Sequence, residues 1–102
     1  MLELGYDGTW QGFLTALYWY FKKGQATKIV KNADIRQHLF MVRINVISDV
    51  EKAKLTRAFL IKKLFNRQLA LIKRIFYSEN PESEEIIIYF IETCLKDHKK
   101  TT

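Results

Sequence analysis

The sequence predicts an α+β protein: a small sheet of two or three strands with one helix, followed by three consecutive helices. Three observations support this fold class. Short strand-like segments occur only within the first 47 residues. A segment with apolar residues at helical spacing lies between the first two of them. From Ser48 onward, helix-start signals recur, each followed by more apolar residues at helical spacing.

The first part of the chain is expected to hold the strands and the first helix. Asp7 and Gly8 form a turn signal directly after a short strand-like segment. Thr9 is placed to cap a helix that runs to about Lys23, where Gly24 would end it. The strands themselves are expected at residues 2–6, 26–30 and 39–47.

The second helix is expected to begin at a capping box. The sequence SDVE matches this pattern, with Ser48 as the cap and Glu51 reaching back to it. The helix should reach about Phe65. Its apolar residues form one broad arc: Val50, Ala53, Ala58, Leu60, Ile61, Leu64 and Phe65.

Two further helices are expected after the second. Asn66 is placed to cap a helix over residues 67–78. Asn80 precedes the last helix, and Pro81 would occupy its first position, where the missing N–H costs nothing. The apolar residues from 86 to 95 continue this helix.

Length and composition limit the class of protein. The 102 residues fit one domain, expected over residues 1–98 with a frayed tail at 99–102. The net charge of +6 and the pI near 9.5 favour acidic partners. The single cysteine, Cys94, excludes an internal disulfide and suits a reducing compartment. The first ten residues lack the basic start of a signal peptide, and we expect a cytoplasmic protein away from membranes.

The positive charge is concentrated in one block. Residues 52–78 contain eight cations and no acid. On the helix expected at 67–78, cations and a tyrosine gather opposite the apolar face, an arrangement that suits phosphates and base stacking. An ordinary solvated helix face is the alternative. The predicted nucleic-acid contacts are Lys52, Lys62, Lys63, Arg67, Lys73, Arg74 and Tyr77.

The second helix also carries apolar residues outside its main arc. Leu55 and Phe59 lie on its far side, and Arg57 projects from inside the arc. A helix that is apolar on two sides is a centre layer or an interface. With an aromatic residue of the first helix, these form the predicted partner-binding set: Trp19, Leu55, Arg57 and Phe59.

Patterns for catalysis or metal binding are scarce. Cys94 and His98 are four residues apart, but a structural zinc site takes four ligands. The glutamates near the start of the last helix fit the helix dipole without any catalytic role. We therefore expect no catalytic residue, metal or cofactor. A small enzyme would need a pocket that joins His38 to acids distant in sequence.

The order of motifs resembles a bacterial family of DNA-metabolism proteins of unknown function. Three segments carry the resemblance: YDGTWQGFLTALYWYF, QHLFMVRINVISDVEKAKLTRAFLIKKL and ALIKRIFYSENPESEEIIIYFIETCLK. They match most of this chain and about the N-terminal half of the usual family member. The residues that match the family motifs are Tyr6, Asp7, Gly8, Gly12, Phe13, Leu14, Thr15, Ala16, Leu39, Phe40, Val42, Asp49, Glu51, Lys52 and Ala53.

This resemblance implies a role in DNA repair or modification, as an accessory protein. Members of the family are encoded beside a radical-SAM protein, and some are fused to a domain of the uracil-DNA glycosylase type. The leading hypothesis is therefore a non-catalytic accessory domain that binds the nucleic-acid backbone, with DNA favoured. The alternative is a protein-interaction module, an adaptor or inhibitor of a larger DNA-processing enzyme, encoded by a mobile element.

Overall fold

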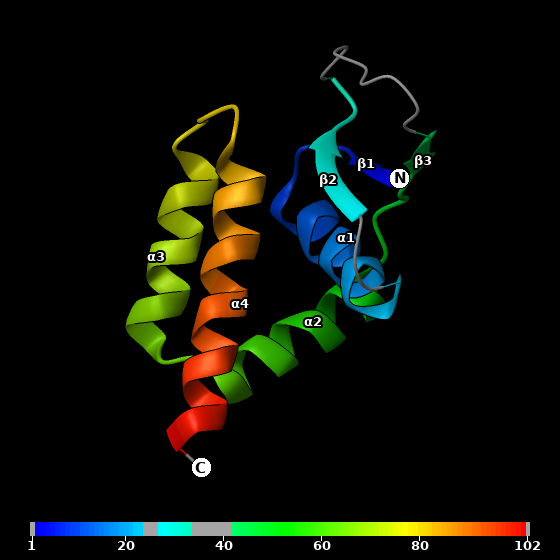
Figure 1. Cartoon of the computed structure of the whole chain (residues 1–102). Helices are drawn as coiled ribbons and strands as arrows, with labels where there is room; N and C mark the ends of the chain where they lie inside the picture. Colours follow the sequence, from blue (N-terminus) through cyan, green and yellow to red (C-terminus); the bar gives the residue numbers. More distant parts are fainter. Residues whose placement is uncertain (1, 24–26, 34–41, 102) are drawn as a thin grey trace. The chain divides into compact units, whose positions relative to one another are not determined.

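A computed structural model describes residues 2–23, 27–33 and 42–101, and its element order confirms the α+β class (Figure 1). The chain divides into two compact units, residues 1–57 and 58–102. The single domain expected from the sequence stays a prediction. In chain order the elements are β1 (Leu2–Tyr6), α1 (Trp10–Lys23), β2 (Thr27–Lys31), β3 (Val42–Asn45), α2 (Val50–Lys63), α3 (Asn66–Tyr77) and α4 (Ser83–Thr101).

The three strands form a parallel sheet in the order β2-β1-β3. Leu4 of the central strand pairs with Ile29 of β2 and Ile44 of β3. A parallel pair needs a crossover connection, and α1 supplies it between β1 and β2. The Tyr6 and Phe13 rings meet with their centroids 5.7 Å apart, and both side chains are buried. The core of the first unit therefore lies between α1 and the face of the sheet that carries Leu4 and Tyr6.

The turn from β1 into α1 is built as the sequence predicted. Gly8 has a φ of 88°, a conformation that glycine adopts without steric cost. The Thr9 hydroxyl accepts a hydrogen bond from the Gly12 N–H at 3.0 Å and so caps the helix. Asp7 Oδ1 in turn accepts bonds from the Thr9 N–H at 3.0 Å and the Thr9 hydroxyl at 2.6 Å. The helix N-terminus is thereby filled by the protein's own carboxylate.

The other face of the sheet carries polar side chains. The buried Glu3 carboxylate lies 3.1 Å from Nε of Arg43, its neighbour in the β1–β3 register. At the next level, the Asn32 side-chain amide donates to Asn45 Oδ1 at 2.8 Å. Gly5 lies beneath this bridge, and a Cβ there would overlap Asn32 Oδ1. The polar layer thus requires a glycine at the centre of the sheet.

The expected start of the second helix is wrong by one residue. The Asp49 side chain, rather than that of Ser48, caps α2, because its Oδ1 accepts a hydrogen bond from the Lys52 N–H at 3.1 Å. The Ser48 hydroxyl instead accepts a bond from the Gln11 side chain at 2.9 Å. The two residues have similar capping propensities, so a tertiary contact decides between them.

The starts of the last two helices also differ from the prediction. Asn66 is the first residue of α3, and Phe65 precedes it, donating its N–H to Gln68 Oε1 at 2.9 Å. Asn80 accepts a bond from the Glu82 N–H at 2.8 Å, as a cap would, but α4 begins only at Ser83. Pro81 therefore lies in the turn before the helix.

In the second unit, α3 and α4 run side by side in opposite directions (Figure 1). Its buried apolar side chains are Leu60, Leu64, Ile72, Phe76, Ile87 and Ile91. The arc expected on the second helix is only partly buried, because Val50, Ile61 and Phe65 are exposed. Residues 99–101 of the expected tail belong to α4, and residue 102 lies outside the described residues.

Candidate nucleic-acid interface

The predicted contact residues are divided between the two units. Lys52 and the partner-binding candidates Trp19, Leu55 and Arg57 belong to the first unit, and Phe59 to the second. The remaining predicted nucleic-acid contacts all belong to the second unit: Lys62, Lys63, Arg67, Lys73, Arg74 and Tyr77. A coherent charged surface can therefore be described within residues 58–102.

Helix α3 presents its cations on one side. Arg67 and Arg74 are exposed and two turns apart, about 10 Å along the helix axis. Ile72 and Phe76 are buried on the opposite side. Lys73 and Tyr77 are also exposed, as the helical spacing predicted. We call Arg67, Lys73, Arg74 and Tyr77 the α3 basic face.

The corner between α2 and α3 adds an aromatic residue to this surface. Lys62 is exposed at the end of α2, and Lys63 is half-buried. Phe65, placed by the sequence pattern on the buried arc, has 69% of its surface exposed. It lies between Lys62 and Arg67 in the chain, so an exposed ring that can stack on a base has cations as close sequence neighbours. The signal that was missed is Gln68, whose side chain bonds the Phe65 backbone and marks it as the residue before the helix.

Most glutamates of the second unit lie at the other end of the α3–α4 pair. Glu79, Glu82 and Glu85 are exposed in the turn between the helices and the first turn of α4. Glu92 is the exception among the glutamates of this unit. Tyr77, two residues before Glu79, therefore lies at the acidic end of α3, whereas Phe65 lies at the basic end. This separation favours Phe65 over Tyr77 as a stacking ring beside phosphates.

Lys52 has partners inside the first unit. Its ammonium lies 3.2 Å from Asp49 Oδ2, and 5.8 Å and 5.6 Å from the ring centroids of Tyr18 and Trp19. Bonds from the Lys52 backbone N–H and ammonium lower the pKa of the Asp49 carboxyl. Lys52 is half-buried in this arrangement, and its predicted phosphate contact stays a prediction.

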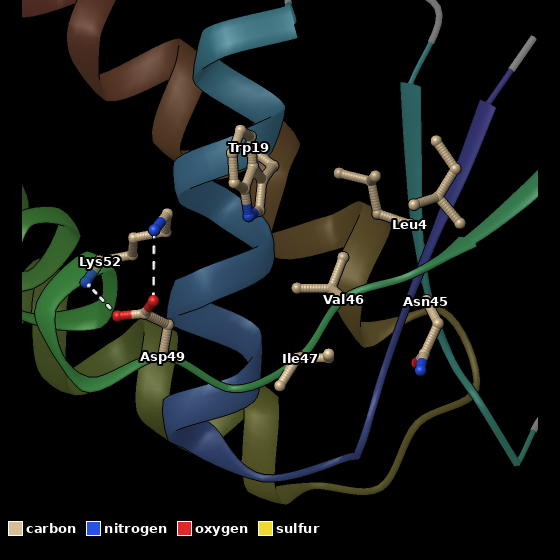
Figure 2. Close-up of a pocket in the computed structure, with 8 residues that line it drawn as sticks. Leu4, Trp19, Asn45, Val46, Ile47, Asp49 and Lys52 are labelled. Atoms are coloured by element: carbon tan, nitrogen blue, oxygen red, sulfur yellow. Dashed lines mark hydrogen bonds and ion pairs between the residues drawn. The ribbon is translucent and has the colours of Figure 1, made fainter.

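The first unit also contains an open pocket of about 420 Å³ (Figure 2). Trp19 of α1 forms one side, and Leu4 of β1 and Val46, which follows β3, lie across from it. The Asp49–Lys52 ion pair borders the pocket beyond Trp19. The lining residues are Leu4, Trp19, Ile44, Asn45, Val46, Ile47, Asp49 and Lys52.

The described residues offer no group of three His, Cys, Asp or Glu side chains able to hold a metal ion. His38 and the side chain of His98 lie outside the described part of the chain. Cys94, the single cysteine of the sequence, is half-buried. Within the described segments, the helices are too short or too polar to cross a membrane.

Comparisons with protein-family models, curated proteins and solved structures found no match. The resemblance to the DNA-metabolism family therefore stays an expectation carried by the motifs quoted above.

Proposed function

We propose that this protein is a non-catalytic accessory domain in DNA repair or modification that binds the nucleic-acid backbone, with DNA favoured. The observation that carries the proposal is the pair Arg67 and Arg74, both exposed and two turns apart on α3. Guanidinium groups bind phosphate oxygens with two parallel hydrogen bonds, and arginine is enriched wherever phosphate is recognised. Lys62 extends this surface at the end of α2.

The proposed contacts are to phosphates, and weak sequence preference follows. Phosphate contacts position a protein on nucleic acid, whereas sequence is read at base edges. If Lys62, Arg67 and Arg74 each neutralise one phosphate, log K should fall against log salt with a slope of about −3.

The test is fluorescence anisotropy with single- and double-stranded DNA and RNA over a salt series. The charge reversal Arg67→Glu/Arg74→Glu should abolish binding at moderate salt. The matched control is Lys54→Glu/Arg57→Glu, which makes the same change in net charge on exposed residues of the first unit. If both variants lose the same affinity, net charge alone explains the loss. If the unchanged protein does not bind at low salt, the proposal is refuted.

The alternative, a protein-interaction module, has its own supporting observation. Leu55 has 60% of its surface exposed and Phe59 38%. Large exposed apolar side chains are typical of contact sites. Candidate partners are the radical-SAM and glycosylase-type proteins that the family resemblance suggests. A stoichiometric complex with such a protein, resistant to nuclease and lost in Leu55→Ser, would support this function instead.

A further inference from the structure

The pocket of the first unit has the composition of a site for a flat, mainly apolar ring. Its volume of about 420 Å³ lies within the range of small-molecule sites, which are mostly apolar with few polar groups. Of the apolar side chains that line it, Leu4 and Val46 are buried, Trp19 is half-buried, and Ile44 and Ile47 are exposed (Figure 2). Enzymes that extrude a base hold it stacked between aromatic and apolar side chains.

The charges around the Trp19 end of the pocket favour an anion attached to such a ring. The Lys52 ammonium lies 5.6 Å from the Trp19 ring centroid, and the Lys22 ammonium lies 5.5 Å from that of Tyr18. The Tyr18 and Trp19 rings meet edge to face at 5.3 Å, so the two lysines border one aromatic pair. Asp49 balances one of these two positive charges. A net positive charge beside an apolar pocket complements a ring that carries a phosphate.

From the pocket and these charges together, we infer that the first unit binds one unpaired nucleotide of a single strand. The base stacks on Trp19 beside the exposed aliphatic side chains of Ile44 and Ile47, and a flanking phosphate lies near Lys22 and Lys52. The inference rests on the proposed function for the class of ligand and adds a second contact site to it. A base inside a duplex is stacked and paired, so single strands are the expected ligand.

The same geometry predicts tolerance of different bases. The Asn45 amide, which could read a base edge, points away from Trp19 and is bonded to Asn32 (Figure 2). The Asp49 carboxylate is already paired with Lys52. Stacking on an aromatic ring holds any base, because every base has a π-face. Strands of thymine, cytosine or adenine should therefore bind with similar affinity.

The experiment uses Trp19 as its own reporter. The chain has two tryptophans, and Trp10→Phe leaves Trp19 as the single one. The full-length variant is titrated with a thymine 12-mer and with an abasic strand of equal length. We expect saturable quenching by the thymine strand and on the order of tenfold weaker binding of the abasic strand, the loss of one stacked base. Equal affinities without a base-dependent quench would overturn the inference.

Two substitutions on β3 localise the effect. Ile44→Phe adds bulk to a lining residue, while Val42→Phe places the same side chain at an exposed residue of that strand outside the lining. The first should remove the preference for the thymine strand, and the second should keep it. If both variants keep the preference, the base lies elsewhere and the inference fails.

The outcome separates this inference from the proposed function. At low salt, where residual binding is measurable, Arg67→Glu/Arg74→Glu should weaken the binding of both strands by a similar factor and leave the ratio of their affinities unchanged. If the thymine and abasic strands bind with equal, salt-sensitive affinity, the proposed function is retained and the pocket is overturned. If the charge-reversal variant binds with unchanged affinity and still prefers the thymine strand, the pocket is retained and the α3 basic face is overturned.

Discussion

The side-chain hydroxyl of Thr15 on α1 lies against the backbone of Asp49 at the start of α2. Thr15 Oγ1 accepts a hydrogen bond from the Asp49 N–H at 3.1 Å and lies 2.9 Å from the Gln11 carbonyl oxygen, to which it donates. Thr15 is fully buried, so this contact is shielded from water. The Asp49 side chain then accepts a bond from the Lys52 N–H and caps α2. One threonine of α1 thereby fixes where α2 begins.

Thr15→Val should destabilise the protein although the two side chains have nearly the same shape. Valine removes the acceptor for the Asp49 N–H, and an unpaired buried donor costs about 1–3 kcal/mol. Thr15→Ser keeps the hydroxyl and loses one methyl group, about 1 kcal/mol. The free energies of unfolding can be measured with urea, followed by circular dichroism. If Thr15→Val lowers the free energy of unfolding less than Thr15→Ser does, the importance of the hydrogen bond is contradicted.

The cap of α2 can be identified by two alanine substitutions. Asp49→Ala removes the side chain that accepts the Lys52 N–H, and the loss of an N-cap costs about 1 kcal/mol. Ser48→Ala removes only a surface bond with Gln11, and we expect a change within about 0.5 kcal/mol. Urea unfolding of both variants in one buffer compares them directly. A larger loss for Ser48→Ala would favour the cap expected from the sequence.

These positions show how far sequence reasoning reaches. Local signals were sufficient for the strand at 2–6, the Thr9 cap and the exposed cations of α3, because each depends on neighbours within one or two turns. The choice of Asp49 over Ser48 depends on Thr15, 34 residues away. The parallel order of the strands and the pocket beside Trp19 likewise arise from pairings distant in sequence.

Gly5→Ala should destabilise the first unit by overpacking the polar face of the sheet. The added Cβ would overlap Asn32 Oδ1 and lie 3.1 Å from Arg43 Cδ, which disturbs both the amide bridge and the ion pair of Glu3. Overpacking costs about 1–3 kcal/mol. Thermal unfolding of Gly5→Ala and of Gly5→Ala/Asn32→Ala provides the test. Gly5→Ala should lower the stability less when Asn32 is already alanine than when asparagine is present, since the overlapping oxygen is then gone. Strict additivity would show that the overlap does not cause the loss.

Acid should weaken the protein through the carboxylates at the starts of α1 and α2. Hydrogen bonds from the Thr9 hydroxyl and N–H lower the pKa of Asp7, and bonds from the Lys52 N–H and ammonium lower that of Asp49. A pKa that is lower in the folded state means that the folded protein binds fewer protons, so stability rises with pH. The contribution is complete above the ordinary carboxyl pKa, roughly 4, and is lost as the pH falls through the lowered values.

The urea midpoint, measured from pH 7 down to pH 2, should therefore fall mainly below about pH 4 to 5, near the ordinary carboxyl pKa. Asp7→Asn/Asp49→Asn retains oxygen acceptors at both caps but cannot titrate there. In this double variant we expect lower stability at pH 7 and a shallower fall toward acid, because the charge-assisted part of each bond is absent at every pH. Parallel curves for the two proteins would assign the acid sensitivity to other carboxyl groups.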